Sequence, residues 1–366
     1  MIAIVMIAFL LVALAIYAPL FNERSRLMLY AFAAVVLILL VSLRHYDCNR
    51  DSYVYHQMYE MAPPMSLLKK SFSEYNDKTI TEFTYSALCT VLKDTSNPER
   101  TNFIIIFALY ALLGVSVNLY AIRKLTDLEF LSLFIYYSNM FFLHEMTQVR
   151  AGVAIGFLLL GVAALRDEKY VKFCVLLLVG SLFHTSVLMG FVLLLFRNRR
   201  ADVYLWSLAF SVCVVMHLLK VDLFDILRLI PFDFFQYKLK AYIMLQEREN
   251  FSINYLNFSF LVQLAVTVMC FFYREKMEQE NKSVNILLNM VCFSSCCYLL
   301  FGQIPGFAVR ISEVFNSSLV ILIPLITKAM YPKALSESIV IAIGALLFYI
   351  NAFRSEIMMF GYELIF

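Results

Sequence analysis

Charged residues are scarce in this sequence. Only 16% of its 366 residues are Asp, Glu, Lys or Arg, whereas 62% are hydrophobic, with 34 Phe and 22 Tyr. This balance excludes an ordinary soluble domain and is typical of a protein that crosses a membrane many times. The net charge of +3 is small and no basic run exceeds RNRR at 197–200, so we expect no nucleic-acid partner.

Motifs of metal- and nucleotide-dependent enzymes are also missing. No Gly-rich phosphate loop, HExxH or G-x-S-x-G motif occurs, and no Cys/His spacing matches a zinc site. We therefore expect neither a metal nor a cofactor. Six of the eight cysteines fall in apolar runs, where they are small packing residues. Cys48 and Cys89 lie in a polar segment, where a disulfide and two free thiols are both open.

Long apolar runs dominate what is present. A helix needs about 20 residues to cross the hydrocarbon core of a bilayer. Ten spans are predicted, at 1–20, 27–43, 101–122, 128–143, 151–165, 203–219, 254–272, 284–302, 314–331 and 336–353. The first of them has no basic segment ahead of it and no A-x-A site, so we expect a retained helix and not a cleaved signal peptide.

The apolar stretch 169–196 is too long for one ordinary span and short for two. Basic clusters lie on both sides of it, namely Arg166, Lys169 and Lys172, then Arg197, Arg199 and Arg200. Short basic loops stay in the cytoplasm, so the chain must enter the membrane and return. Two short helices are predicted, at about 169–182 and 185–196, forming a hairpin that turns near His184. The alternative is one tilted helix.

The fold class that follows is an all-α polytopic membrane protein with about twelve crossings, two of them short. Residues 1–366 form a single integral membrane domain in this prediction. The outer face receives both termini and the segments 44–100, 144–150, 220–253 and 303–313. The two large outer loops are 44–100 and 220–253, and the first includes an amphipathic stretch at 81–92 that is predicted to lie along the interface.

Three arginines lie where apolar runs end, all on the predicted outer face: Arg44, Arg150 and Arg310. The positive-inside rule does not explain arginines there, and arginine near the hydrocarbon is a candidate functional residue. Its guanidinium also binds phosphate groups bidentately. The alternatives are local ion pairs and headgroup contacts for Arg44, a snorkelling side chain paired with Glu145 for Arg150, and a salt bridge to Glu313 for Arg310.

Two further features accompany the arginines. Gly152 and Gly156 form a G-x-x-x-G motif after Arg150, which predicts the close approach of another helix. His184 lies at membrane depth in the predicted hairpin, where a neutral imidazole can accept the proton of an attacking hydroxyl. A histidine with only a structural role is equally open.

Taken in their order along the chain, the segments that contain these residues resemble the EpsG/Wzy family of bacterial polysaccharide polymerases. The matching residues are Arg44, Asp51 and Tyr55, then Glu82 with Phe83, then Gln148, Arg150 and Gly152, then Phe183, His184 and Ser186, then Arg310 and Pro324. One position departs from the family pattern, because Asn49 stands where the family has glycine in its first loop.

The resemblance implies a fold similar to GT-C glycosyltransferases, which take lipid-linked donors. It implies polymerisation of O-antigen or exopolysaccharide repeat units, carried as oligosaccharides on undecaprenyl pyrophosphate, at the periplasmic face of the bacterial inner membrane. It also implies a chain-length regulator and a flippase of the same pathway as partners, besides membrane lipid.

The catalytic residues expected from this combination are His184, Asp51, Arg150 and Arg310. Arg150 and Arg310 hold the pyrophosphate, and His184 or Asp51 is the base that deprotonates the acceptor hydroxyl. The substrate-binding residues expected are Arg44, Tyr55, Glu82, Gln148 and Glu313. The alternatives are an O-antigen ligase and a transporter or flippase of lipid-linked glycans. A transporter would need charge through the depth of a cavity and an internal repeat, and neither is found in the sequence.

Overall fold

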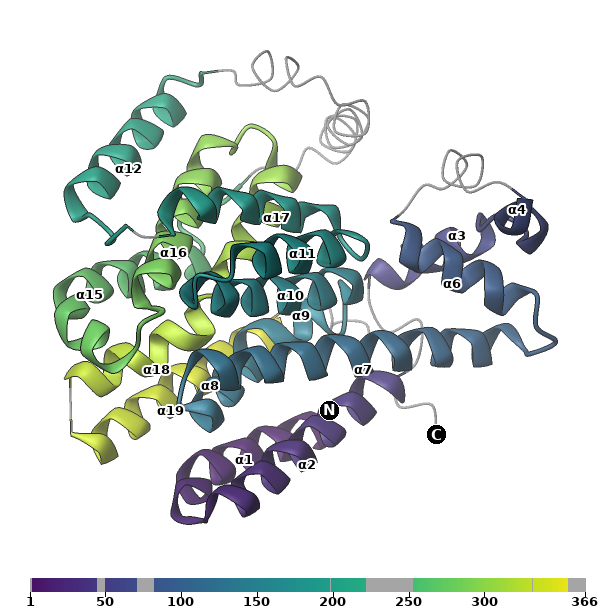
Figure 1. Cartoon of the computed structure of the whole chain (residues 1–366), viewed down its shortest axis with the longest axis horizontal. Coiled ribbons are helices and arrows are strands. Elements are labelled where there is room, and N and C mark those ends of the chain that lie inside the picture. Colours follow the sequence, from purple (N-terminus) through teal and green to yellow (C-terminus); the bar gives the residue numbers. More distant parts are fainter. Residues whose placement is uncertain are drawn as a thin grey trace. The chain divides into compact units, whose positions relative to one another are not determined.

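Two compact helical units make up the computed structural model. The structure describes residues 2–44, 50–70, 82–197, 199–221, 253–330 and 332–354, and each element in these ranges is a helix. The first unit comprises residues 1–188 and 323–366, and the second comprises residues 189–322 (Figure 1). The prediction of an all-helical protein is thus confirmed.

Several of these helices are long and apolar enough to cross a membrane, which confirms a multi-pass membrane protein. Six qualify among the described residues: Ile2–Leu20, Glu23–Ser42, Glu99–Leu125, Val149–Arg166, Phe258–Glu280 and Lys333–Arg354. A seventh span results if Pro305–Asn316 and Leu319–Met330, which are bent by 49°, count as one. The number of twelve crossings stays a prediction.

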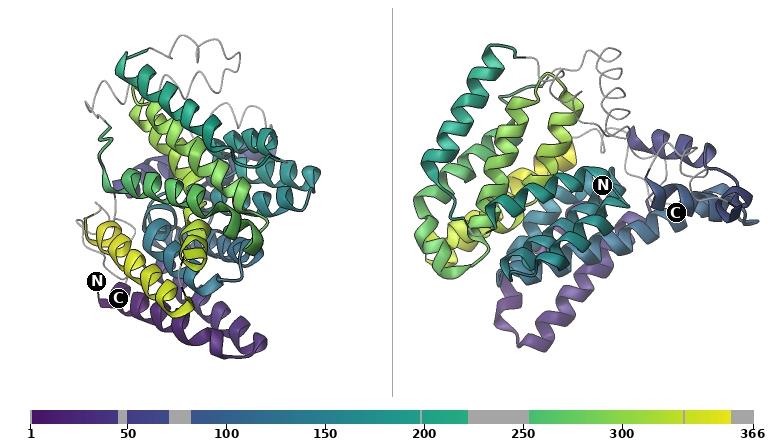
Figure 2. Two further views of the ribbon diagram at one scale, coloured as in Figure 1. Left: turned by 90° about the vertical axis from the view of Figure 1, so that its left-hand side faces the viewer. Right: turned by 45° about the horizontal axis from the view of Figure 1, so that its top comes forward.

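The first unit is built around one long helix. This helix, α7 (Glu99–Leu125), packs against α2 (Glu23–Ser42) and α10 (Val149–Arg166), and α10 packs against α11 (Tyr170–Ser181). An acidic residue begins α7 and two basic residues end it, which suits the helix dipole. α1 (Ile2–Tyr17) turns through η1 (Ala18–Leu20) into α2 (Figure 2).

Close contact between α7 and α10 depends on glycine, as the G-x-x-x-G motif predicts. A Cβ added at Gly156 would lie 2.9 Å from Val117 Cγ1 and 3.1 Å from the Asn118 backbone nitrogen on α7. At Gly152, the added atom would lie 2.9 Å from Oε1 of Glu145. Both glycines therefore make room for neighbours that carry the site described below.

Within its described residues, 44, 50–70 and 82–100, the segment 44–100 contains three helices of its own. They are α3 (Arg50–Glu60), α4 (Met65–Lys70) and α6 (Phe83–Lys93). The last covers most of the predicted amphipathic stretch 81–92 and ends one residue past it, whereas α3 and α4 lie where the sequence predicted only a loop. An apolar cluster that includes Tyr55 of α3, Tyr85 of α6 and Phe107 of α7 joins α3 and α6 to α7. The helices α3 and α6 are thereby packed against α7, one of the candidate spans.

The break near His184 is present, as predicted. α11 ends at Ser181, and η3 (Thr185–Phe196) begins after Leu182–His184. η3 is a 3₁₀ helix over its 12 residues, which is unusually long for this form and was not predicted from the sequence. At about 2.0 Å per residue it extends roughly 24 Å, against about 18 Å for an α-helix. Twelve residues thus cover most of a hydrocarbon core about 30 Å thick.

A second interrupted helix covers the predicted span 128–143. It consists of α8 (Glu129–Tyr136), a π-helical turn η2 (Tyr137–Phe141) and α9 (Phe142–His144). α19 (Lys333–Tyr349) and its π-helical end η4 (Ile350–Arg354) pack beside it, with Tyr137 and Phe348 stacked at 5.7 Å.

In the second unit, α16 (Val284–Leu300) packs against three other helices, α12 (Val203–Leu218), α15 (Phe258–Glu280) and α17 (Pro305–Asn316). α17 differs from the prediction, because 303–313 was expected to be an outer loop. The predicted span 314–331 is accordingly divided between α17 and α18 (Leu319–Met330). The aromatic loop at 220–253 lies almost wholly outside the described residues.

Candidate functional site

A buried carboxylate joins three segments of the first unit. Glu82, at the N-cap of α6, pairs through Oε2 with Nη1 of Arg150. Its other oxygen, Oε1, lies 3.3 Å from Nδ1 of His184 and 3.4 Å from both the backbone nitrogen and Oγ1 of Thr185. The start of α6, the start of α10 and the break before η3 therefore meet at one acidic side chain.

Aromatic rings surround Arg150. Its guanidinium carbon lies 5.6 Å from the ring centre of Tyr55 and 5.8 Å from that of Tyr85. The Tyr85 hydroxyl donates a hydrogen bond of 3.1 Å to the backbone oxygen of Tyr55, which fixes the two rings together. Cation–π contacts and the Glu82 carboxylate hold the Arg150 side chain in a single place.

Arg44 is buried in a different environment. Only 1% of its surface is exposed, and its guanidinium carbon lies 4.2 Å from the ring centre of Phe107. Nε, Nη1 and Nη2 of Arg44 have no hydrogen-bond acceptor among the described residues. A buried cation without an acceptor is strongly unfavourable. The sequence predicted an arginine at the membrane interface but not its complete burial.

Tyr55 lies within the field of both arginines. Burial raises the pKa of the Tyr55 hydroxyl, and the positive charges of Arg150 and Arg44 oppose that rise. Asp51, one turn earlier on α3, adds to the rise through its negative charge. Arg44, Asp51 and Tyr55 of one predicted motif and Arg150 of another are thus brought into one neighbourhood.

Gln148 and Glu145 hold the start of α10. Gln148 is the N-cap of α10, and its backbone nitrogen donates to the Leu143 oxygen at 2.7 Å. Glu145 is buried, and its Oε1 accepts hydrogen bonds from Tyr136 at 2.7 Å and from Asn118 at 3.0 Å. The alternative in which Glu145 pairs with Arg150 is therefore wrong, since Arg150 pairs with Glu82.

Two residues of the site, Thr185 and Phe107, were not predicted from the sequence. Thr185 adjoins His184 in the motif, and its contacts to Glu82 depend on the helix break that the basic flanks predict. Phe107 lies among many similar phenylalanines of an apolar helix, so no local signal marks it as the platform for Arg44.

Arg310 and Glu313 belong to the second unit. Both lie in α17, where their side chains are half-buried, and not in the loop that the sequence predicted. α17 begins with Pro305 at a position that favours helix initiation.

One group of side chains in the described ranges has the composition of a metal site. His56, Glu60 and Glu99 place their ligand atoms within 4.8 Å of one another, with His56 Nε2 2.9 Å from Glu99 Oε1. All three are at least partly exposed, and they lie on α3 and at the start of α7. The expected absence of a metal stays a prediction.

Cys89 is a buried free thiol on α6, and burial raises the pKa of this thiol to about 12. Cys48, the other cysteine of the outer segment, lies outside the described residues.

These features define the class of protein: a multi-pass, all-helical membrane protein with an Arg–Glu–His cluster at the starts of two helices and the break before a third. The chain matches the EpsG family over residues 27–364, and it belongs to that family. The resemblance predicted from the motifs is confirmed at this level. No curated protein and no solved structure matches the chain.

Proposed function

We propose that this protein is a glycosyltransferase that polymerises O-antigen or exopolysaccharide repeat units carried on undecaprenyl pyrophosphate. The observation that carries the proposal is the pair of buried arginines around Tyr55, joined through Glu82 to His184. Membership of the EpsG family supports the same reaction class. In this proposal the site faces the periplasm, and the protein lies in the bacterial inner membrane.

Arg44 is the first residue assigned to the pyrophosphate. Its three guanidinium nitrogens have no acceptor in the described ranges, and phosphate oxygens supply acceptors in the geometry that guanidinium prefers. Charge builds on the pyrophosphate as it leaves the donor sugar. Fixed positive groups aimed at that charge lower the barrier, with a loss of about 10²–10³ in rate when such a donor is removed.

His184 is assigned as the base. Its Nδ1 faces Glu82, and a proton on Nδ1 leaves Nε2 unprotonated. Nε2 then accepts the proton of the acceptor hydroxyl as that oxygen bonds to the anomeric carbon and the sugar–pyrophosphate bond breaks. Glu82, predicted as a substrate ligand, is reassigned to hold Arg150 and His184 in place. Asp51 is the alternative base.

Arg310 is retained as a catalytic ligand of the pyrophosphate on the family motif. Glu313 is retained as a substrate residue on its place one turn after Arg310 in α17, and Gln148 on its place at the start of α10. The proposal also includes twelve crossings, a GT-C-like arrangement, and a chain-length regulator and a flippase as pathway partners.

The test uses cells that depend on this chain for their polysaccharide. Arg44→Ala, Arg150→Ala, His184→Ala and Arg310→Ala are expected to abolish the long-chain ladder on gels while leaving single repeat units on the lipid core. Arg200→Ala is the matched control, because Arg200 is exposed and pairs with Glu278. Long chains made by Arg44→Ala and Arg150→Ala at unchanged protein level would contradict the site.

The same gels separate the two alternatives. Loss of a ligase removes even single units from the lipid core, whereas loss of a polymerase leaves them. Loss of a flippase prevents any unit from reaching the periplasm. In the deletion strain we therefore expect lipid core that carries a single repeat unit.

A further inference from the structure

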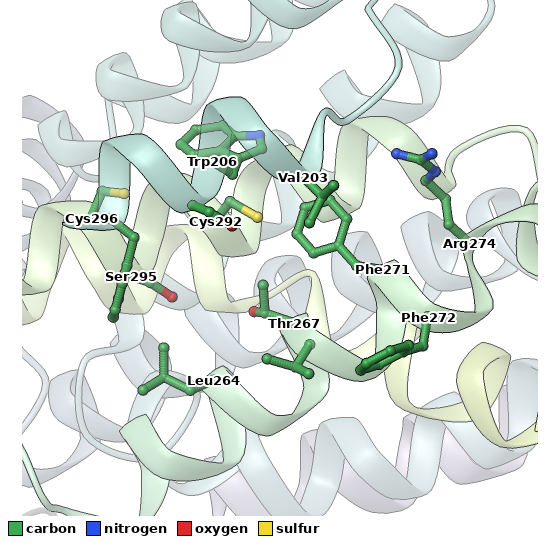
Figure 3. A pocket seen from close by; sticks show the side chains of 13 residues that line it. Val203, Trp206, Leu264, Thr267, Phe271, Phe272, Arg274, Cys292, Ser295 and Cys296 are labelled. Carbon is green, nitrogen blue, oxygen red and sulfur yellow. The ribbon is translucent and has the colours of Figure 1, made fainter. Parts of the chain in front are cut away.

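A cavity of about 460 Å³ lies in the second unit, between α12 and α15 where both pack on α16. Its size is in the range of ligand-binding pockets. Figure 3 shows Cys296 and Trp206 toward one end of the cavity and Arg274 toward the other. No residue that we assign to glycosyl transfer lines it.

The polar side chains in the cavity wall form their hydrogen bonds with the protein itself. Thr267 Oγ1 donates to the Gln263 backbone oxygen at 2.8 Å, and Ser295 Oγ donates to the Val291 oxygen at 3.0 Å. The indole nitrogen of Trp206 donates to Asn289 Oδ1 at 2.7 Å. Since the protein already satisfies these groups, the cavity presents mainly hydrocarbon surface to an occupant.

Arg274 is the charged residue that lines the cavity. Its Nη1 donates to the Ala201 backbone oxygen, while its Nε lies 3.9 Å from Glu278 Oε1 and has no hydrogen-bond acceptor in the described ranges. Glu278 is held instead by Arg200, through two hydrogen bonds of 2.8 and 2.7 Å. Arg274 therefore retains capacity for an anion at the end of an apolar cavity.

The sequence places this end of the cavity at the cytoplasmic face. Arg200 lies just before α12 and pairs with Glu278 near the end of α15, so the basic segment 197–200 and the end of α15 lie together. Short basic segments next to membrane helices stay in the cytoplasm, where the leaflet is rich in anionic lipid.

We propose that the cavity binds an anionic membrane phospholipid, with one acyl chain between α12 and α15 and the phosphate group at Arg274. The acyl chain is compatible with the apolar wall, and the negative phosphate is attracted by the positive charge of Arg274 at its end. The donor glycan lipid is a poorer fit, because its pyrophosphate reacts at the opposite face in the function proposed above. The phospholipid site does not depend on that function.

Trp206 makes a direct test possible, because it is the only tryptophan in the chain. The purified full-length protein is placed in bilayers of phosphatidylcholine with increasing amounts of phosphatidylglycerol that carries bromine on one acyl chain. Bromine quenches indole fluorescence on contact. We expect saturable quenching at a low mole fraction of the brominated lipid, reversed by unbrominated phosphatidylglycerol.

Two filling variants and one control show whether the cavity is the site. Thr267→Phe and Ser207→Phe place a ring in the cavity from opposite walls. Both are expected to raise the half-quenching concentration at least about tenfold, which is about 1.4 kcal/mol. Ala265→Phe adds the same ring at an exposed position of α15 outside the cavity and is expected to change nothing.

A second arm tests the headgroup. Arg274→Gln is expected to remove the preference for brominated phosphatidylglycerol over brominated phosphatidylcholine, whereas Lys276→Gln, at an exposed position of α15, is expected to keep it. Quenching that follows the bulk lipid fraction equally in wild type and both filling variants would overturn the proposal. So would displacement by a polyprenyl phosphate at far lower concentration than by phosphatidylglycerol.

Discussion

Two buried arginines of the first unit differ in how far neighbouring protein groups offset their positive charge. Arg150 has a carboxylate and two tyrosine rings, whereas Arg44 has one phenylalanine ring and no hydrogen-bond acceptor in the described part of the chain. Contacts within the protein therefore hold the Arg150 side chain in place. Among the described residues, Arg44 is held by packing against Phe107, and its charge is available to a ligand.

Replacing Arg44 by leucine is expected to separate stability from activity. Arg44→Leu removes an uncompensated buried charge, so the empty protein in detergent should become more stable by about 1–4 kcal/mol. Polymer formation should fall by about 10²–10³. Thermal unfolding and polysaccharide gels measure the two effects.

Inorganic pyrophosphate provides the control for the Arg44 variant. It should raise the unfolding midpoint of the wild type and leave that of Arg44→Leu unchanged. A loss of stability in Arg44→Leu would mean that Arg44 is a structural residue.

Arg150 and Glu82 should behave as a pair. Arg150→Leu or Glu82→Leu alone removes the opposite charge that faces the remaining residue, and each is expected to lower stability by about 3–5 kcal/mol. The double variant Arg150→Leu with Glu82→Leu should recover most of that stability and remain inactive. Protein abundance in membranes and thermal unfolding report the coupling, and additive losses in the double variant would contradict it.

The site residues lie where helices begin or break. Glu82 is the N-cap of α6, Arg150 lies in the first turn of α10, and His184 lies between α11 and η3. At these places the backbone of a membrane protein needs other partners for its polar groups. The carboxylate of Glu82 meets part of that need at the last break, where the Thr185 nitrogen lies 3.4 Å from its Oε1.

Helix spacing at the site depends on Gly114 of α7. A methyl group at Gly114 would collide with Oε2 of Glu145, while one at Gly161 on α10 would lie 3.2 Å from Phe173 Cδ2. Gly114→Ala is expected to destabilise the protein by about 1–3 kcal/mol, since overpacking forces neighbours apart. Gly161→Ala is the control and should be nearly neutral. Thermal unfolding in detergent measures both.

A double-mutant cycle checks the stated cause. Glu145→Ala removes the group that collides, so Gly114→Ala should cost less stability in the Glu145→Ala background than in the wild type. Equal costs in both backgrounds would show that Glu145 is not the obstacle.

The sequence predicted some of these elements better than others. The break at His184 followed from basic residues on both sides of one apolar stretch, and the α7–α10 contact followed from Gly152 and Gly156. The 3₁₀ form of η3 and the helix around Arg310 were missed, because apolar runs carry the same hydrophobic signal in either helical form and at either depth. The Arg150–Glu82 pair was missed because its residues are far apart in the chain.

For the whole molecule, helix length identifies the candidate spans, and the distribution of basic residues predicts their orientation. Six helices of the described chain are long enough to span, and shorter ones such as α11 and η3 lie between basic flanks. In the proposed topology, these flanks remain in the cytoplasm and the His184 break reaches toward the periplasm.

Site-directed labelling tests this topology. Single cysteines replace Lys169, Arg199 and Arg100 in a cysteine-free variant, and intact spheroplasts are treated with a membrane-impermeant maleimide. Arg100→Cys, at the outer start of α7, should react, whereas Lys169→Cys and Arg199→Cys should react only after the membrane is opened. Reaction of exactly one of the last two in intact spheroplasts would mean that 169–196 crosses the membrane once.

The most direct measurement is polymerisation by the purified protein in liposomes that contain undecaprenyl-pyrophosphate-linked repeat units. We expect a ladder of products with the wild type, none with Arg44→Leu at equal protein, and release of one undecaprenyl pyrophosphate for each bond formed. Movement of the lipid-linked units across the bilayer without any ladder, or a full ladder from Arg44→Leu, would contradict this expectation.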